Sequence, residues 1–332
     1  MAGYDRAGAN SRFFLHGQHA TSICGAVGAA AAASMLLDLP AEGVADAMGI
    51  ACSFAAGILE GNRTGGTVKR THCGWAAQGG VTAAQLARRG FTGPPTVFEG
   101  KFGFFQAFLK GDYDADEITN KLGQYWEVPN IFFKPYPANH FTHAGADAAI
   151  ALRERGLRPE DVDHIVLAVP SYAARTIGEP IEVKRAPQSG YQAQFSGPYV
   201  VAAALFGGHG LGLSLVDFED GLATDPARQA LMKRIDVSGD AECDEIFPHQ
   251  FPAILRVKLF GGEEIVERVL STRGGPQRPL TTAELGAKFV DNVSPWMPAD
   301  AIDRFGQLIE QPAVLDDLET LLAGTVGKGS VR

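Results

Sequence analysis

The chain has 332 residues, of which 45% are hydrophobic and 20% are charged, and its formal net charge is −9. This composition is ordinary for a globular protein with a large core and room for two domains. The acidic balance, without any block of five or more basic residues, argues against nucleic acid as a partner.

The predicted elements of the first hundred residues are packed helices. In chain order they are an irregular polar start over 1–17, helices over about 22–37, 40–56 and 74–89, and a loop over 61–66. Thr21 and Ser22 are candidate N-caps of the first helix, which is lined with small residues that permit close packing. An aromatic cluster follows and is expected to lie in a core; it comprises Phe102, Phe104, Phe105, Phe108 and Leu109.

From Ile131 onward the pattern predicts a mixture of helices and strands. In chain order these are a helix over about 143–155 capped by Thr142, a strand over 162–169, a helix over 198–206, a hairpin of 254–259 and 264–270 that turns at Gly261 and Gly262, a helix over 285–293, and helices over about 298–310 and 312–323 before a polar tail. Thr281 and Glu284 have the spacing of a capping box ahead of the helix over 285–293.

Neither a leader nor a membrane span is predicted. The N-terminus lacks the charged-then-apolar pattern of a signal peptide, and the most apolar stretch, 21–37, is short and ends at Asp38. The four cysteines are far apart and form no C-x-x-C pair, which argues against a disulfide framework or a zinc knuckle and indicates a reducing compartment. We therefore expect a cytoplasmic protein with no membrane partner.

Three groups of cationic side chains each lie just ahead of a predicted helix. They are His19, then Lys69 with His72, and then Lys134 with His140 and His143. A helix N-terminus offers free backbone N–H groups and the positive end of its dipole, so it favours an anion. If the three groups meet in the fold, they form a site for a small polycarboxylate.

The same groups have the chemistry needed for proton transfer. A lysine close to other cations has a lowered pKa and can act as a base, and histidine exchanges protons near neutral pH. Removal of a proton next to a carboxylate also requires cations that stabilise the enolate-like charge. This inventory fits dehydration, decarboxylation or epimerisation of an acid.

Simpler interpretations exist for each of these residues. Lys69 and Lys134 are also typical of solvated surface positions, and His209, which lies between glycines, reads as part of a turn. The H-x-x-H spacings at 16/19 and 140/143 have no placed carboxylate beside them, so they are weak evidence for a metal.

Several motifs together resemble the MmgE/PrpD family, and the similarity covers nearly the whole chain. They are H-A-T with G-A-V-G-A-A-A-A over 19–32, K-R-T-H-C-G-W-A-A over 69–77, G-F-T-G-P over 90–94, K-P-Y-P with F-T-H over 134–143, and P-L-T to K-F over 279–289. The resemblance implies an enzyme without metal or other cofactor, built from a large all-α domain and a smaller α/β lid. It also implies an active site between the two domains and, usually, a homodimer.

On this resemblance we predict a mixed fold with a helical domain over 1–128, an α/β lid over 129–275, and a return to the helical domain over 276–332. Residues that match the family's site histidine and two site lysines are predicted to be catalytic: His19, Lys69 and Lys134. Substrate-binding roles are predicted for Arg70, His72, His140, His143 and Tyr199.

The expected activity is a hydro-lyase reaction on a small di- or tricarboxylate, with a hydroxy acid similar to 2-methylcitrate as the default substrate. Asn139 stands where the decarboxylase branch has a histidine, which weakens a decarboxylase assignment. An epimerase similar to iminodisuccinate epimerase stays open, because it needs the same proton chemistry.

Family members are longer at the N-terminus and carry a D-D-T…H type segment there, which this chain lacks. The chain therefore reads as beginning well inside the helical domain. A non-catalytic remnant is the alternative from another class of protein. Helices such as 22–37 are then expected to expose an apolar face.

Overall fold

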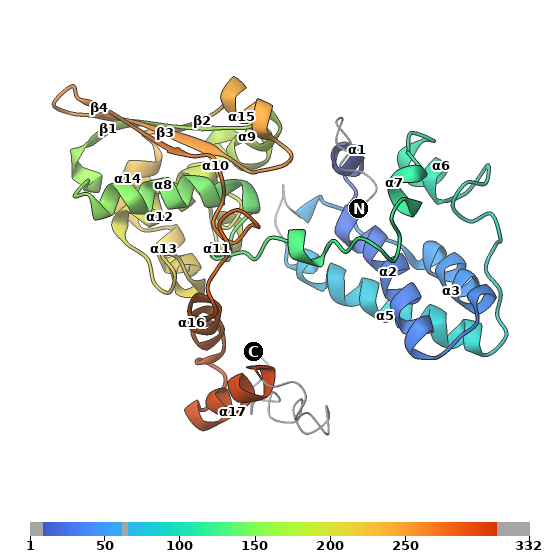
Figure 1. The fold of residues 1–332 in the computed structure, drawn as a ribbon. Helices are drawn as coiled ribbons and strands as arrows, with labels where there is room; N and C mark the ends of the chain where they lie inside the picture. Colours follow the sequence, from blue (N-terminus) through green and yellow to red (C-terminus); the bar gives the residue numbers. More distant parts are fainter. Residues whose placement is uncertain (1–8, 62–65, 311–332) are drawn as a thin grey trace. The chain divides into compact units, whose positions relative to one another are not determined.

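The computed structural model describes residues 9–61 and 66–310, and it divides into two compact units, Met1–Trp126 and Glu127–Arg332 (Figure 1). The predicted helix over 312–323, the polar tail and residues 62–65 of the predicted loop lie outside the described residues. The structure groups the described part of the predicted return segment with the second unit. Packing of this segment against the helical domain stays a prediction.

The described part of the first unit is helical, as predicted. Its elements are α1 Ala9–Leu15, α2 Ala20–Leu36, α3 Ala41–Phe54, η1 Val68–Thr71, α5 His72–Arg88, α6 Phe104–Leu109 and α7 Asp116–Thr119. The three predicted helices are confirmed as α2, α3 and α5, with ends shifted by one or two residues. The prediction of an irregular N-terminal segment was wrong for residues 9–15, which form α1 and bury Phe13.

The predicted N-caps of α2 were wrong. The helix begins earlier, with His19 as its N-cap, because the extended His19 backbone presents its carbonyl to the N–H groups of Ser22 and Ile23. Thr21 and Ser22 therefore lie within the first turn. The Ser22 hydroxyl is 2.6 Å from the Ala56 carbonyl oxygen and ties α2 to the chain beyond α3.

Helices α2 and α5 pack backbone against backbone. A Cβ placed on Gly80 would lie 2.5 Å from Ala29 Cβ and 2.6 Å from the Ala30 backbone nitrogen, so only glycine fits there. Ala30 and Ala83 are fully buried between the helices. The small residues of α2 thus permit the close approach that the sequence predicts.

The aromatic cluster is confirmed except at one end. Phe104, Phe105 and Leu109 on α6 are buried together, and Phe108 packs against them. Phe102 precedes α6 and is 89% exposed, so its predicted place in the core was wrong. It lies in the turn ahead of Gly103, which is the N-cap of α6.

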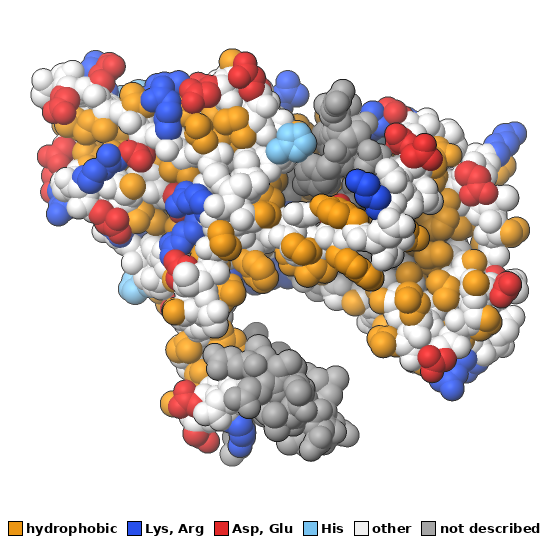
Figure 2. Space-filling view, viewed as in Figure 1, with side chains coloured by type: hydrophobic (Ala, Val, Ile, Leu, Met, Phe, Trp, Pro, Cys, Tyr) orange, Lys and Arg blue, Asp and Glu red, His pale blue; other side chains and the backbone are white. Residues whose placement is uncertain are grey.

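Large apolar side chains are exposed on the first unit. Met35 and Leu36 at the end of α2 are 68% and 85% exposed, and Trp75 and Phe91 are also exposed. Figure 2 shows hydrophobic side chains on the surface of this unit. Although α2 packs against α3 and α5, an apolar part of it faces outward, as expected.

The second unit contains a four-stranded mixed sheet in the order β2-β1-β3-β4. Its elements up to the end of the sheet are η2 Val128–Asn130, η3 His140–Thr142, α8 His143–Glu154, η4 Pro159–Asp161, β1 Val162–Val169, α9 Ser171–Gly178, α10 Ile181–Lys184, α11 Gly190–Ala193, α12 Gly197–Phe206, η5 Leu215–Phe218, α13 Asp220–Ala223, α14 Pro226–Met232, β2 Ile235–Gly239, α15 Ala241–Ile246, β3 Ala253–Leu259 and β4 Glu264–Val269. Helices α16 Thr282–Val293 and α17 Ala299–Glu310 follow.

Strand β1 and the β3–β4 hairpin confirm the predicted strands. Strand β1 pairs antiparallel with β3, with Leu167 opposite Leu255. It also pairs in parallel with β2, with Ile165 opposite Ile235. The sequence did not predict β2, which is short and carries Asp and Ser among its five residues.

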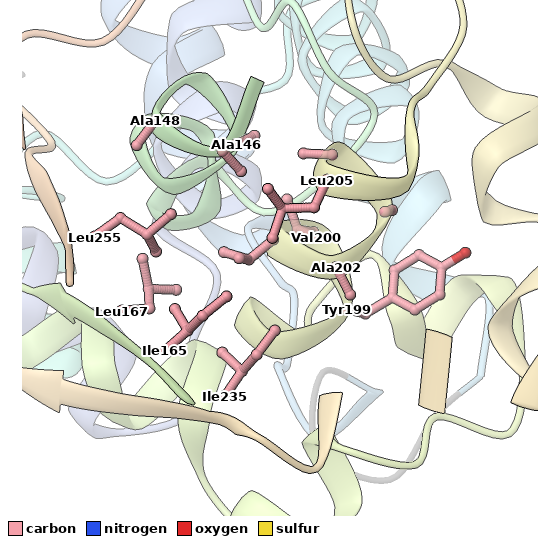
Figure 3. Close-up of a cluster of buried hydrophobic side chains, with 14 of the residues drawn as sticks. Ala146, Ala148, Ile165, Leu167, Tyr199, Val200, Ala202, Leu205, Ile235 and Leu255 are labelled. Carbon is pink, nitrogen blue, oxygen red and sulfur yellow. The ribbon is translucent and has the colours of Figure 1, made fainter. Parts of the chain in front are cut away.

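Helices α8 and α12 cover one face of this sheet (Figure 1). Small side chains of α8, such as Ala146 and Ala148, meet Leu167 and Leu255 of the strands in a fully buried core (Figure 3). The α8 helix therefore starts against the sheet, and its first residue, His143, has no exposed surface.

Within the described ranges, no helix is both long enough and apolar enough to cross a membrane.

Candidate functional site

In the first unit, the fold brings two predicted site residues together. His19 caps α2, His72 opens α5, and their Nδ1 atoms lie 3.0 Å apart. Both side chains are buried. One Nδ1 must carry the proton and the other must accept it, so the two rings cannot both be imidazolium ions in this arrangement.

The surroundings favour the neutral form of His72. Burial, with the charge of Lys69 as a second cause, lowers the pKa of His72. Lys69 is half-buried in the one-turn helix η1, and Arg70 beside it is exposed. The prediction that Lys69 and His72 stand at a helix start is confirmed.

In the second unit, the segment that carries Lys134 is fixed by a backbone hydrogen bond to Gly274. The Phe133 N–H donates to the Gly274 carbonyl oxygen at 2.9 Å. Gly274 has φ +92°, and a Cβ there would collide with the Phe133 carbonyl oxygen. Only glycine permits this approach, which places Lys134 at a defined point of the unit.

Lys134 and His143 share one acceptor. The Lys134 Nζ donates to the Ala138 carbonyl oxygen at 3.2 Å, and the His143 Nε2 donates to the same oxygen at 3.3 Å. This bond requires the tautomer of His143 with its proton on Nε2, so Nδ1 carries a lone pair. Buried Nδ1 has no hydrogen-bond partner among the residues that the structure describes.

His140 lies against His143 in an aromatic surrounding. Its ring centroid is 4.4 Å from that of Phe251 and 5.1 Å from that of His143. The His140 Nε2 is also buried and lacks a partner within 9–61 and 66–310. Two neighbouring imidazoles thus present unused nitrogen atoms, which is uncommon for buried polar groups.

Burial sets the protonation of this cluster. Desolvation, with the Lys134 charge second, lowers the pKa of His140 to about 4. Desolvation also lowers the pKa of His143 well below its usual value. The Lys134 residue as a whole is exposed, but its Nζ atom is partly buried. Desolvation of this amine lowers the pKa of Lys134, and the positive charge of Lys288 lowers it further. The cluster is therefore built from neutral imidazoles and a lysine that loses its proton more readily than usual.

A buried carboxylate supports the same segment. The Tyr136 hydroxyl donates to Asp147 Oδ1 at 2.5 Å, and Arg278 Nη1 lies 3.4 Å from Asp147 Oδ2. Burial raises the pKa of Asp147. Sequence reasoning missed this network, although an aspartate one turn after His143 on α8 was a visible signal.

Asn139 holds the turn between Lys134 and α8. Its side-chain oxygen accepts from the Phe141 N–H at 3.0 Å, and its carbonyl oxygen accepts from the Thr142 hydroxyl at 2.7 Å. Thr142 is the N-cap of α8 as predicted, but its hydroxyl is used in this turn. Asn139 thus has a structural part here.

Tyr199 lies in the core of the second unit. Its side chain has 0% exposure, and its hydroxyl donates to the Asp217 carbonyl oxygen at 2.5 Å and accepts from Arg228 at 3.0 Å. Figure 3 shows it on α12 among the buried side chains. This burial fits a structural role, and contact of Tyr199 with substrate stays a prediction.

His209 has a partner that the sequence did not reveal. Its Nδ1 is 3.0 Å from Oδ1 of the fully buried Asp217, and the other oxygen of Asp217 accepts from the backbone N–H groups of His209 and Ser214. The interpretation of His209 as part of a turn fits these bonds.

Over the described ranges, no group of three or more His, Cys, Asp or Glu residues could hold a metal ion.

The structure therefore assembles two groups from the predicted site residues. His19, His72 and Lys69 lie together in the first unit, and Lys134, His140 and His143 lie together in the second. Each group can bind a carboxylate or exchange a proton. That both act on one substrate stays a prediction.

Comparisons with known proteins agree with the motifs. The profile of the MmgE/PrpD N-terminal domain matches residues 5–116, and that of the MmgE/PrpD C-terminal domain matches residues 136–311. The chain is 29% identical over 325 residues to the cis-aconitate decarboxylase of Homo sapiens, covering 92% of this chain and 63% of that protein. It is 28% identical over 314 residues to the cis-aconitate decarboxylase of Mus musculus, covering 91% of this chain and 61% of that protein. It is 27% identical over 268 residues to the cis-aconitate decarboxylase of Aspergillus terreus, covering 76% of this chain and 54% of that protein. The chain thus spans less than two thirds of the length of these relatives, and by the match of both domain profiles it belongs to the MmgE/PrpD family.

Proposed function

We propose that the chain acts as a metal-independent lyase on a small di- or tricarboxylate, and that its reaction is the dehydration of a hydroxy acid similar to 2-methylcitrate. The observation that carries the proposal is the shared acceptor of Lys134 and His143, with unused nitrogen atoms on His140 and His143 beside it. Family membership supports a substrate with carboxylates.

In the proposed reaction, neutral Lys134 accepts the proton from the carbon next to a substrate carboxylate. The electron pair left on that carbon forms a carbon–carbon double bond while the hydroxyl on the neighbouring carbon leaves. The hydroxyl takes a proton from the His19–His72 pair when that pair carries one proton more than its neutral form, and it departs as water while both rings become neutral. The Lys69 ammonium binds a carboxylate and stabilises the charge that develops on it. Proton return from Lys134 to the histidine pair through solvent closes the cycle.

Decarboxylation of an acid similar to cis-aconitate is the second candidate. The printed names of the relatives favour it. It breaks the carbon–carboxylate bond instead of a carbon–hydrogen bond, and it places a proton on carbon. Asn139 weighs against it, because an amide side chain cannot supply a proton as a histidine at this position could, and its oxygen is used in the turn before α8.

We also propose a homodimer in a reducing, cytoplasmic setting. The exposed apolar side chains of the first unit, including Leu36 and Met35, support self-association. All four cysteines are free, which supports the reducing compartment. Light scattering after size-exclusion chromatography checks the dimer, and a monomer at micromolar concentration would contradict it.

The activity is tested by incubating the full chain with 2-methylcitrate and with cis-aconitate and following products by proton NMR in water and in D₂O. We expect loss of water from 2-methylcitrate, with kcat/KM at least about 100-fold lower in Lys134→Met. Lys233→Met, which changes an exposed lysine at the end of α14, is the control.

The other outcomes assign or reject the function. Release of CO₂ from cis-aconitate would establish the second candidate, and deuterium in recovered substrate without loss of water would establish an epimerase. Unchanged turnover in Lys69→Ala would remove Lys69 from the mechanism. Absence of turnover for all tested acids by the folded chain would refute the proposal and favour a non-catalytic protein.

A further inference from the structure

We infer that Lys288, on α16, is a positioning residue that holds the Lys134 segment in place. Its Nζ donates to the backbone carbonyl oxygen of Lys134, 154 positions earlier in the chain. The catalytic consequence of this contact rests on the proposed function. The contact itself does not.

Few backbone N–H groups are available to hold the Lys134 segment. Pro135 and Pro137 follow Lys134, and neither has a backbone N–H to donate. Upstream, the Phe133 N–H bonds to Gly274, and downstream the Ala138 N–H bonds to the Tyr136 carbonyl within the same segment. The Lys134 carbonyl is therefore a further point, beside the bonds of Phe133 to Gly274 and of Tyr136 to Asp147, at which a distant element fixes this stretch of backbone.

Helix α16 is tied to the rest of the unit at its N-terminus. The Thr281 N–H donates to Glu284 Oε2 at 2.7 Å, and the Thr281 hydroxyl accepts from the Glu284 N–H at 3.2 Å, so the predicted capping box is confirmed. Arg273 Nη2 bonds to Glu284 Oε1 at 2.5 Å, and Arg273 Nη1 donates to the Leu211 carbonyl oxygen. Lys288 lies one turn beyond Glu284 and shares its face of the helix.

A cavity lies between α16 and the segment, so the two do not pack tightly. It has a volume of about 230 Å³, and its lining includes Pro135, Pro137, Lys288 and Asp291. Because the space is open, packing alone does not prevent the segment from shifting toward α16. The long Lys288 side chain reaches across this cavity and connects α16 to the Lys134 carbonyl oxygen.

Lys288 also adds a positive charge to the cluster. The groups that face Lys134 are Lys288 from α16, His140 from η3 and His143 from α8, and Asp291 lines the cavity on the α16 side. The Lys288 charge is the second cause, after burial, that lowers the pKa of Lys134. Loss of Lys288 therefore has two consequences: the segment loses an anchor, and Lys134 holds its proton more strongly.

The test measures Lys134 directly. Limited labelling with acetic anhydride, which reacts only with neutral amines, is followed by mass spectrometry over a range of pH for the unaltered chain, Lys288→Met, Lys288→Arg and the control Lys233→Met. We expect half-maximal labelling of Lys134 to move to higher pH in Lys288→Met. Lys288→Arg, which keeps the charge and the donors, and Lys233→Met should leave it in place. With a substrate turned over by the unaltered chain, kcat should fall about tenfold in Lys288→Met while KM changes little.

These measurements separate the inference from the proposed function. An unchanged labelling profile of Lys134 in Lys288→Met, with far-UV circular dichroism showing a folded chain, would overturn the inference whatever the activity. A shifted profile in a chain that turns over no acid would support the positioning role and refute the proposed function. Equal shifts in Lys288→Arg and Lys288→Met would also overturn it, because a retained charge would then have no effect.

Discussion

A single methyl group on α5 should separate two helices of the first unit. Replacing Gly80 with Ala puts a Cβ 2.5 Å from Ala29 Cβ and 2.6 Å from the Ala30 backbone nitrogen. Carbon atoms in contact prefer separations of at least about 3.5 Å, so α2 and α5 must move apart by about 1 Å. The atoms in the way are the Ala29 Cβ and the backbone of Ala29 and Ala30, and none of them can rotate out of the way.

The magnitude follows from two opposing effects. Alanine is favoured over glycine inside a helix by about 1 kcal/mol. Overpacking of a tight contact costs about 1–3 kcal/mol, and more where backbone must move. Gly79→Ala, one residue earlier in α5, is the matched control, because its Cβ would lie at an ordinary 3.7 Å from Phe54 Cβ. We expect Gly79→Ala to unfold at higher urea than the unaltered chain and Gly80→Ala to lie about 1–3 kcal/mol below that control.

The assay is urea unfolding followed by far-UV circular dichroism for both variants and the unaltered chain. Because α2 carries His19 and α5 carries His72, we also expect the 3.0 Å contact between their Nδ1 atoms to weaken in Gly80→Ala. A Gly80→Ala chain as stable as Gly79→Ala would show that α2 and α5 do not pack as closely as described, and the reasoning would fail.

Two further predictions concern buried groups of the second unit. Since burial lowers the pKa of His140 from 6.5 to about 4, unfolded chains bind its proton first as the pH falls, and stability should decline between about pH 6.5 and 4. His140→Phe should reduce this decline by up to about 3 kcal/mol, measured by urea unfolding at pH 4.5 and 7. Equal declines in His140→Phe and the unaltered chain would contradict the assignment. Tyr199→Phe removes both hydroxyl bonds and should cost about 1–3 kcal/mol of stability while kcat and KM stay unchanged. A large rise in KM would instead return Tyr199 to the substrate site.

Local patterns of the sequence were sufficient for many elements of the fold. The strand β1, the β3–β4 hairpin and the capping box before α16 appear where predicted, because alternation, turn glycines and the Thr-to-Glu spacing act within a few residues. Strand β2 was missed for the converse reason. Its five residues include Asp236 and Ser238, and only pairing with β1 makes them a strand.

The candidate site divides in the same way. The sequence by itself determined which basic side chains stand at helix starts, since His19 is the N-cap of α2 and His72 and His143 are the first residues of α5 and α8. It also indicated the family through motifs that need no fold to be recognised. Both are properties of neighbouring residues along the chain.

Only the tertiary structure decided which partners these residues have. The contact of His19 with His72 spans 53 positions, and that of Lys288 with the Lys134 carbonyl spans 154. Tyr199 likewise became a core residue because η5, with Asp217 and Phe218, and α14, with Arg228, pack against its ring. Such contacts depend on how whole helices pack, and close packing is a property of many distant residues acting together, which no short stretch of sequence contains.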